Sequence, residues 1–238
     1  MPPPPWFSAH LVSARTLAPS VRELTFARDD GPLEFTAGQW VNLELSTEKG
    51  PLVRAYSIAS APDGTSHFDL AVTHVEGGPG SSALHAMTPG DAVKAQGPQG
   101  FFSRDTGAGH PCLFVATGTG ITPLRSMLHA ALAAGAREPM TVLLGVRHEA
   151  DLLYRDDLEA LAARHPNVRF VPTLSRGAET WAGRRGWVQT HVAELWQALG
   201  PDTHVYVCGL ERMVKAVRDV VRKDLGVARQ HVHSERYD

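Results

Sequence analysis

The sequence has little of what several large protein classes depend on. Its 238 residues include only two cysteines, Cys112 and Cys208, too few for a disulfide framework, a four-cysteine zinc site or an iron–sulfur cluster. No apolar run reaches the roughly 18 residues that a membrane-spanning helix needs. The first residues, Met1–Pro5, lack the basic and apolar regions of a signal peptide. We therefore expect a cytoplasmic protein without a membrane span.

An excess of positive charge is also missing. The 23 Lys and Arg residues are offset by 25 Asp and Glu residues, which gives a formal net charge of -2 and no overall field to attract nucleic acid. With 43% hydrophobic and 20% charged residues, the composition is that of an ordinary globular protein. Nucleic-acid binding is therefore not expected.

Two common catalytic signatures are absent as well. The 12 histidines form no His-Glu-x-x-His pattern, and the nearest pair, His231 and His233, needs no metal, because alternate residues of a strand share one face. No Gly-x-Ser-x-Gly elbow follows a strand, which disfavours a serine hydrolase. We expect no metal site, so any redox chemistry must come from a bound organic cofactor.

The first part of the chain, residues 1–105, has the texture of an antiparallel β domain. Short apolar stretches of alternating type are separated by turns rich in proline, glycine and aspartate, which predicts a small barrel or sandwich. A short helix over Ser81–Met87, capped by Ser81 or Ser82, interrupts the strands. The expected strands are His10–Thr16, Val21–Ala27, Trp40–Leu45, Arg54–Ser60, Phe68–Val75 and Ala92–Ala95.

The second part, residues 106–238, alternates continuous apolar strands with amphipathic helices. This order is typical of a parallel sheet covered by helices on both faces. The expected strands are Cys112–Ala116, Val142–Val146, Val168–Thr173 and Val205–Cys208. The expected helices are Pro123–Ala134, Asp156–Arg164, Val188–Leu199 and Glu211–Leu225.

A strand, a glycine-containing turn and a helix meet at the start of the second part. The turn reads Thr117-Gly118-Thr119-Gly120, and Pro123 follows in the first helical turn. Glycines let the backbone approach a phosphate, and the free amides of the first helical turn point toward it. The third glycine of the dinucleotide-binding fingerprint is replaced by Pro123. Taken alone, the pattern fits either a phosphate site or a plain tight turn.

A second group of residues lies in the β part. Arg54-Ala55-Tyr56-Ser57 is followed about twenty residues later by a turn that contains Gly78, Gly80, Ser81 and Ser82. Alternation along a strand places Arg54 and Tyr56 on one face and Ser57 on the other, unless the strand ends or bulges there. Taken alone, Arg54 is better explained as a solvated charge and Tyr56 as an aromatic of the barrel wall.

Together these residues resemble the ferredoxin–NADP reductase superfamily of flavoproteins. The resemblance covers nearly the whole chain and rests on five short motifs in the family's order: Arg54–Ser57, Gly78–Ser82, Gly118–Pro123, Cys208-Gly209 and Glu235–Tyr237. It implies two domains. An antiparallel FAD-binding β-barrel of Greek-key type would occupy residues 1–105, and an α/β parallel-sheet domain that binds NADP would occupy residues 106–238.

The resemblance also assigns roles on the flavin side. It implies that Arg54 pairs with the FAD pyrophosphate, a role that suits its planar guanidinium. Tyr56 would lie against the isoalloxazine ring, Ser57 would hydrogen-bond near flavin N5, and Ala55 is expected among the FAD-binding residues. The backbone around Gly78, Gly80, Ser81 and Ser82 would hold phosphate at the start of the short helix.

At the hydride-transfer centre the resemblance implies four catalytic residues. These are Ser57, Cys208 beside the nicotinamide, Glu235 as a proton relay or partner contact, and Tyr237 as a cover for the flavin. Asp238 follows Tyr237, whereas several branches of the family end on the aromatic residue. A small buried residue remains an alternative for Cys208, and a frayed tail for Glu235 and Tyr237.

On the nicotinamide side the resemblance implies contacts from the glycine turn, from Cys208-Gly209 and from basic residues after successive strands. A 2′-phosphate needs charge-assisted donors near the ribose. The residues expected to bind NADP are Thr117, Gly118, Thr119, Gly120, Pro123, Arg147, Ser175, Arg176, Arg184, Cys208 and Gly209. We therefore favour NADPH, with NADH as the alternative.

The sequence thus predicts an FAD-dependent enzyme that transfers hydride between NADPH and FAD. Because two cysteines are too few to hold an iron–sulfur cluster, electrons would pass to a separate carrier such as ferredoxin or flavodoxin. The alternatives are the reductase component of an oxygenase system and a regulatory flavin-binding module. FMN in place of FAD is a minor alternative, and a monomer is expected.

Overall fold

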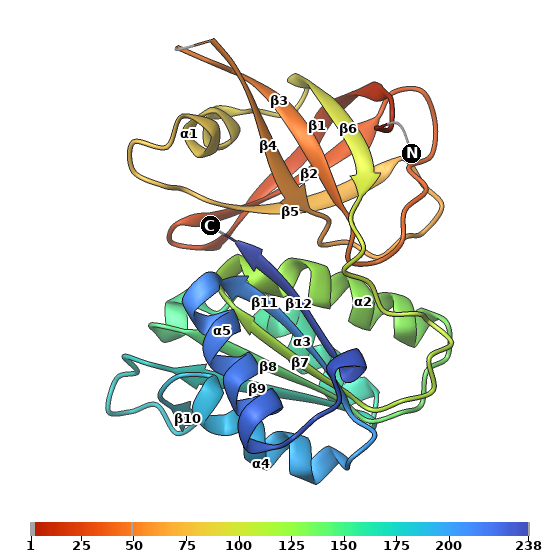
Figure 1. The fold of residues 1–238 in the computed structure, drawn as a ribbon. Helices are drawn as coiled ribbons and strands as arrows, with labels where there is room; N and C mark the ends of the chain where they lie inside the picture. The colour runs from red at the N-terminus through yellow and green to blue at the C-terminus, as the bar shows by residue number, and fades with distance from the viewer. Residues whose placement is uncertain (1–2, 49, 238) are drawn as a thin grey trace.

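The computed structural model describes residues 3–48 and 50–237. It contains two β-sheets that follow one another in the chain, an antiparallel barrel drawn above a parallel sheet with its helices (Figure 1). None of the helices within the described residues is long and apolar enough to cross a membrane.

The barrel is built from six antiparallel strands in the order β4-β3-β6-β1-β2-β5. A bridge between Ile58 and Leu70 joins the β4 end to β5 and closes the sheet. Because β6 returns beside β3, the order is that of a Greek key. The elements are β1 (Trp6–Ala18), β2 (Val21–Arg28), β3 (Trp40–Thr47), β4 (Gly50–Ser57), β5 (His67–Thr73), α1 (Pro79–Ala86) and β6 (Ala92–Gln99).

The second sheet is parallel throughout, in the order β10-β9-β8-β7-β11-β12. Its strands are β7 (Cys112–Thr117), β8 (Met140–Val146), β9 (Val168–Leu174), β10 (Arg184–Arg185), β11 (His204–Leu210) and β12 (Val232–Tyr237). Its α-helices are α2 (Ile121–Ala133), α3 (Arg155–Arg164), α4 (Gln189–Leu199) and α5 (Glu211–Asp219). Shorter helical turns are Gly118–Gly120, Glu149–Asp151, Val220–Asp224 and Arg229–His231.

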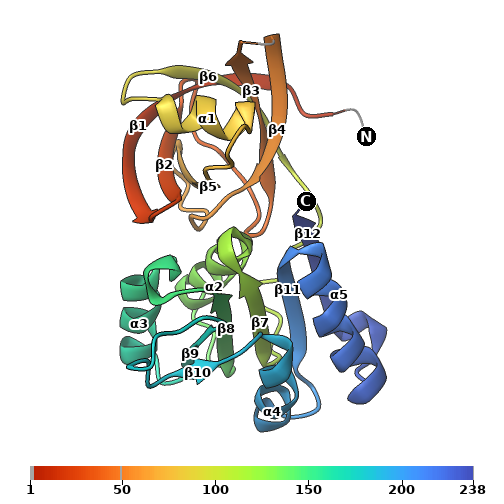
Figure 2. The same cartoon turned by 90° about the vertical axis from the view of Figure 1, so that its left-hand side faces the viewer.

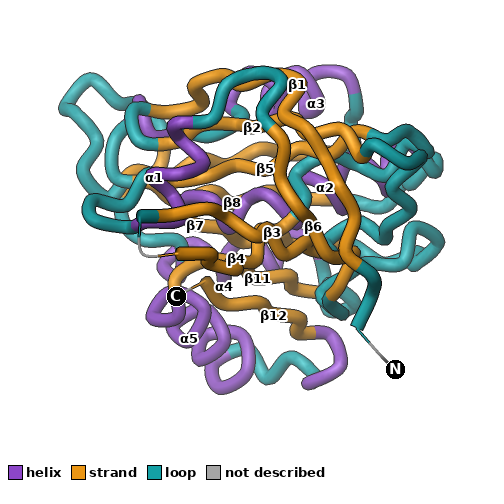
Figure 3. Tube along the Cα trace, turned by 90° about the horizontal axis from the view of Figure 1, so that it is seen from above, coloured by secondary structure: helices purple, strands orange, loops and turns teal. Residues whose placement is uncertain are grey.

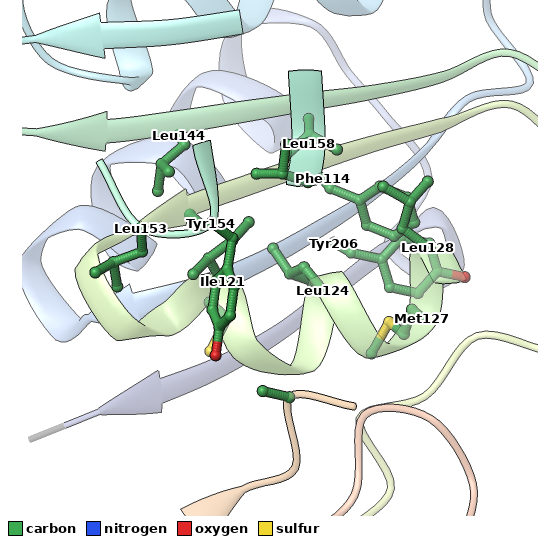
Figure 4. Close-up of a cluster of buried hydrophobic side chains, with 14 of the residues drawn as sticks. Phe114, Ile121, Leu124, Met127, Leu128, Leu144, Leu153, Tyr154, Leu158 and Tyr206 are labelled. Atoms are coloured by element: carbon green, nitrogen blue, oxygen red, sulfur yellow. The ribbon is translucent and has the colours of Figure 1, made fainter. Parts of the chain in front are cut away.

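Strand β7 separates two cores, because its successive side chains point to opposite faces of the sheet. Leu113 and Val115 pack with residues of α4 and α5. Phe114 and Ala116 pack with α2 and α3 in a cluster that also includes Phe102 and alanines of the barrel. Figure 4 shows the inner part of this cluster, and Figure 2 shows α2 between the sheet and the barrel. The barrel and the sheet are therefore joined by a continuous apolar core.

Two hydrogen bonds reinforce the contact between the barrel and α2. The Arg125 guanidinium donates to the Ala59 carbonyl at 2.8 Å, and the Ser126 hydroxyl donates to the Ser60 carbonyl at 2.6 Å. Arg125 is also held from the sheet side, by Asp157 at 2.7 Å. Buried polar groups with partners on both sides fix one relative position of the two sheets.

The fold class expected from the sequence is confirmed, and each expected strand is present with its ends moved by a few residues. The expected serine cap of α1 is wrong. The helix begins after Gly78 without a side-chain cap, because the Ser81 hydroxyl accepts a hydrogen bond from the Val75 amide at 3.0 Å. The sequence did not predict β12, the parallel edge strand seen beside β11 and α5 (Figure 3).

Four histidines and a tyrosine stack where β7, β11 and β12 begin. The His204 ring lies 3.6 Å from His110 and 4.2 Å from His231, centroid to centroid, and its Nδ1 is 3.1 Å from Nε2 of His233. The His233 ring stacks on Tyr206 at 4.4 Å. Burial, the other histidines and the nearby Arg104 lower the pKa of His204 to about 4. Burial also lowers the pKa of His110 and His233, so these three imidazoles favour the neutral form.

The glycine turn touches the end of β11. A Cβ on Gly120 would lie 2.2 Å from the Cys208 carbonyl oxygen and 2.7 Å from the Gly209 Cα. Both are backbone atoms of a central strand, which cannot move aside without disturbing the sheet. A glycine is therefore required at position 120 by close approach.

We predict that Gly120→Ala lowers the free energy of unfolding by about 1–3 kcal/mol, the usual range for overpacking. Urea unfolding followed by circular dichroism measures it. Gly107→Ala is the control, because the nearest atom to its Cβ is 3.7 Å away. Equal stability of the two variants would contradict the close-approach argument.

We predict that the histidine stack makes stability depend on pH. An unfolded histidine has a pKa of about 6.5, above that of folded His204, so the unfolded chain binds more protons between these values. Stability should therefore fall as the pH decreases from about 6.5 toward 4. The urea midpoint measured at several pH values should fall less in His204→Gln than in the control His67→Gln, whose residue is exposed. An equal fall in both variants would remove His204 from the effect.

Candidate functional site

Two cavities meet between the barrel and the sheet. The barrel cavity, about 750 Å³, lies between β3, β4, β5, α1 and the end of β12. The sheet cavity, about 490 Å³, lies over the carboxyl ends of the parallel strands, where open α/β sheets bind ligands. Three residues line both cavities: Thr73, Thr119 and Tyr237. A thin wall from three separate elements thus divides the two spaces.

The two β-domain motifs converge in the barrel cavity. A Cβ on Gly80 would lie 3.3 Å from Cγ of Arg54, so the glycine turn packs directly on the arginine side chain. Arg54 is exposed and donates to the Val53 carbonyl, and none of the carboxylates that the structure describes forms an ion pair with it. An uncompensated guanidinium beside the start of α1, whose first turn contains no acidic residue, suits a phosphate ligand.

All four residues of the Arg54–Ser57 motif line the barrel cavity, as do Gly78, Gly80 and Ser81. Strand β4 ends at Ser57, so the simple alternation of faces stops there. Burial raises the pKa of Tyr56 to about 12, and its phenol therefore stays neutral. Ser82 is exposed and lies outside the lining.

The carboxyl end of β12 meets the barrel at Ser57. The Ser57 hydroxyl donates to Oε1 of Glu235 at 3.2 Å, across 178 residues of sequence. Burial raises the pKa of the Glu235 carboxyl, and the Ser57 hydrogen bond opposes this shift. Tyr237 is half-buried, and its hydroxyl lies 3.3 Å from Oγ1 of Thr122. Residues 232–237 are therefore an ordered strand, and Asp238 lies outside the described residues.

Cys208 lies behind this centre. It is fully buried and lines neither cavity. Burial raises the pKa of its thiol, as does the charge of Glu235, while a hydrogen bond with Tyr237 lowers it. The next residue, Gly209, does line the sheet cavity.

The glycine turn forms one wall of the sheet cavity. Thr117, Gly118 and Thr119 line it, while Gly120 and Pro123 are buried behind them. Oγ1 of Thr117 is buried without a hydrogen-bond partner. A Cβ on Gly209, whose φ is +143°, would lie 2.5 Å from that oxygen. An unsatisfied hydroxyl in a space kept open by a glycine points to a polar ligand.

The basic residues after the strands divide into two groups. Arg147 and Ser175 line the sheet cavity, whereas Arg176 and Arg184 do not. Both terminal nitrogens of Arg184 donate to Glu194 of α4, at 2.6 and 2.5 Å. The lining residues that were not expected from the sequence include Arg212 and the 63% exposed Trp187. The signal for Arg212 was its place in the first turn after the Cys208-Gly209 element.

Comparison with known proteins agrees with this geometry. Residues 8–103 match the family model described as oxidoreductase FAD-binding domain, and residues 114–219 match oxidoreductase NAD-binding domain. The chain is 57% identical to ferredoxin–NADP reductase B of Sorangium cellulosum, over 98% of each protein. It is 35% identical to the reductase component DmpP of phenol 2-monooxygenase from a Pseudomonas species, covering 84% of this chain and 57% of that protein.

Solved structures share the fold. An Amycolatopsis cytochrome P450 reductase, GcoB, superposes with a TM-score of 0.88 at 29% identity, over 98% of this chain and 69% of that one. A ferredoxin NADP+ reductase from Neisseria gonorrhoeae with bound FAD and NADP superposes with a TM-score of 0.85 at 23% identity, over 97% and 98% of the two chains. The chain belongs to the ferredoxin–NADP reductase superfamily of FAD- and nicotinamide-dependent oxidoreductases.

Proposed function

We propose that this protein oxidises NADPH through bound FAD and delivers the electrons to a separate protein carrier. The observation that carries the proposal is the shared wall. Thr73, Thr119 and Tyr237 line both cavities. Residues 1–105 would hold the flavin and residues 106–238 the nicotinamide nucleotide, so that the two reactive rings meet at this wall.

The residues of the barrel cavity fit FAD. Arg54 would bind the pyrophosphate together with the backbone at Gly78, Gly80 and Ser81, since the start of α1 carries no competing carboxylate. Tyr56 would pack against the isoalloxazine ring as a neutral phenol. When bound, FAD supplies a hydride acceptor and a store from which electrons leave one at a time.

The residues of the sheet cavity fit a dinucleotide with a 2′-phosphate. Gly118 and Thr119 would approach the pyrophosphate, and the unpartnered Thr117 hydroxyl would bind a polar group of the ligand. Arg147 and Arg212 would pair with the phosphate on the ribose, with Ser175 beside them. Arg212 replaces Arg176 and Arg184 in this assignment, because it lines the cavity and they do not.

At the wall, Ser57 and Glu235 would control a proton. Ser57 is buried, and its hydroxyl has the Glu235 carboxylate as acceptor. Because the pKa of Glu235 is raised, the carboxyl takes up a proton more readily than an exposed glutamate. Once Glu235 is protonated, its carboxyl would donate to Oγ of Ser57, and the Ser57 hydrogen would then be free for the ring beside it.

The carrier is the less specific part of the proposal. Similarity to a ferredoxin–NADP reductase over the whole chain favours ferredoxin or flavodoxin as the carrier. We propose that the reductase is a monomer and meets its carrier in the cytoplasm. Similarity to oxygenase reductase components supports an oxygenase component as the second candidate. Assaying a panel of purified carriers would separate the two.

An anaerobic titration of the FAD-loaded protein tests the proposal. NADPH should bleach the flavin absorbance and NADH should bleach it more slowly. Bleaching without electron transfer to any carrier would leave a flavin-binding module. If the protein binds no flavin after FAD has been added, the proposal is wrong.

We predict that Arg54→Ala loses most of its FAD, because the pyrophosphate would lose its charged donor. The flavin-to-protein absorbance ratio after gel filtration measures this loss. Ser57→Ala is the matched control from the same strand. It should retain FAD and be reduced more slowly by NADPH in stopped-flow experiments. Full FAD content in Arg54→Ala would remove Arg54 from the phosphate site.

We predict that Arg147→Ala and Arg212→Ala each raise KM for NADPH by about 10-fold or more, as expected for a lost charge-assisted hydrogen bond. KM for NADH should change little, because NADH lacks the 2′-phosphate. Steady-state kinetics with an artificial acceptor measure both constants. Arg164→Ala on α3 is the control. Parallel changes for NADPH and NADH would contradict a phosphate contact.

A further inference from the structure

Thr122 connects the glycine turn to the terminal tyrosine. It is the second residue of α2 and is 2% exposed. Its hydroxyl donates to the Thr119 carbonyl at 2.9 Å and lies 3.3 Å from the Tyr237 hydroxyl. The Thr122 side chain thus contacts two residues of the shared wall, Tyr237 and Thr119, the second through its backbone carbonyl.

The direction of these hydrogen bonds follows from the chemistry of the groups. A carbonyl oxygen only accepts, so the single hydroxyl hydrogen of Thr122 is used by Thr119. In its contact with Thr122 the Tyr237 hydroxyl is therefore the donor, and the same hydroxyl also contacts Ser57 and Cys208. Thr122 is thus one of three polar groups that hold the phenol in the wall, and it is the one anchored to the glycine turn.

Tyr237 stands where the two cavities meet. A nicotinamide ring that reaches from the sheet cavity into the barrel cavity has to displace this side chain. Displacement breaks the bond to Thr122, because that oxygen is buried and anchored to the turn. The free energy of this hydrogen bond is then subtracted from the free energy of nucleotide binding.

We propose that Thr122 is a positioning residue that holds Tyr237 in the wall and thereby weakens the binding of the nicotinamide nucleotide. The proposal rests on the function proposed above. It assigns Thr122 a role separate from that of the turn, whose backbone approaches the ligand directly. It also gives a reason for a polar residue at this buried position of α2. An apolar residue would pack there without needing a hydrogen-bond partner.

The test compares variants that differ in one hydroxyl. Thr122→Val keeps the shape and removes the hydrogen-bond acceptor, while the Thr119 carbonyl keeps the Ile121 amide as a partner. The dissociation constant for NADP+, measured by calorimetry on the FAD-loaded protein, should fall by about 2- to 10-fold, the effect of one hydrogen bond. KM for NADPH should fall with it, and kcat should change less. Thr122→Ser should restore the wild-type values.

A second variant tests the same bond from its other end. Tyr237→Phe should also lower the dissociation constant, and adding Thr122→Val to it should have no further effect. The protein has four tyrosines, so ¹⁹F spectra of 3-fluorotyrosine-labelled protein give a readout independent of nucleotide. The resonance that Tyr237→Phe removes should shift in Thr122→Val and return in Thr122→Ser.

The outcomes separate this inference from the proposed function. If wild-type protein binds NADP+ and Thr122→Val binds it equally or more weakly, the positioning role is wrong. An unmoved Tyr237 resonance in Thr122→Val would also overturn it. If the wild-type protein neither binds nor oxidises the nucleotide, the proposed function fails first, and the inference falls with it.

Discussion

The parallel pairing of β12 with β11 is the constraint on which the site depends. It sets Glu235 beside Cys208 and Tyr237 beside Leu210, and so brings the Glu235 and Tyr237 side chains to the barrel. Without this pairing the Ser57–Glu235 bond could not form and the wall between the cavities would lack one of its three members. Strand β12 is paired on one side only, so its position is set by the ladder to β11, the histidine stack and the contacts at its far end.

Much of the site was predictable because its motifs are local. Arg54–Ser57 and the turns that begin α1 and α2 depend on short backbone geometries that glycine and proline mark in the sequence. Strand β12 was missed for the opposite reason. Its residues, Val-His-Ser-Glu-Arg-Tyr, have neither the apolar run of a buried strand nor a regular alternation. The strand forms because it pairs with β11, and the local sequence of residues 232–237 does not indicate that pairing.

The basic residues illustrate a second limit of sequence reasoning. In the sequence, Arg147 and Arg184 both come after predicted strands of the same sheet, and nothing in the pattern predicts that Arg184 begins the short strand β10. The structure separates them through α4, which brings Glu194 to Arg184 and leaves Arg147 facing the cavity. Whether a charged side chain is already paired is a tertiary property. A sequence therefore indicates which edge of a sheet is basic, and the fold decides which charges remain free for a ligand.

The placement of the two thiols has a practical consequence. Cys112 and Cys208 are both fully buried in the parallel sheet, and burial raises the pKa of Cys112 to about 11. A thiol reagent needs an accessible thiolate, so neither sulfur reacts while the sheet is closed. The barrel half has no cysteine. The rate of cysteine alkylation therefore reports how often the nucleotide-binding half alone opens, and its measurement needs no engineered label.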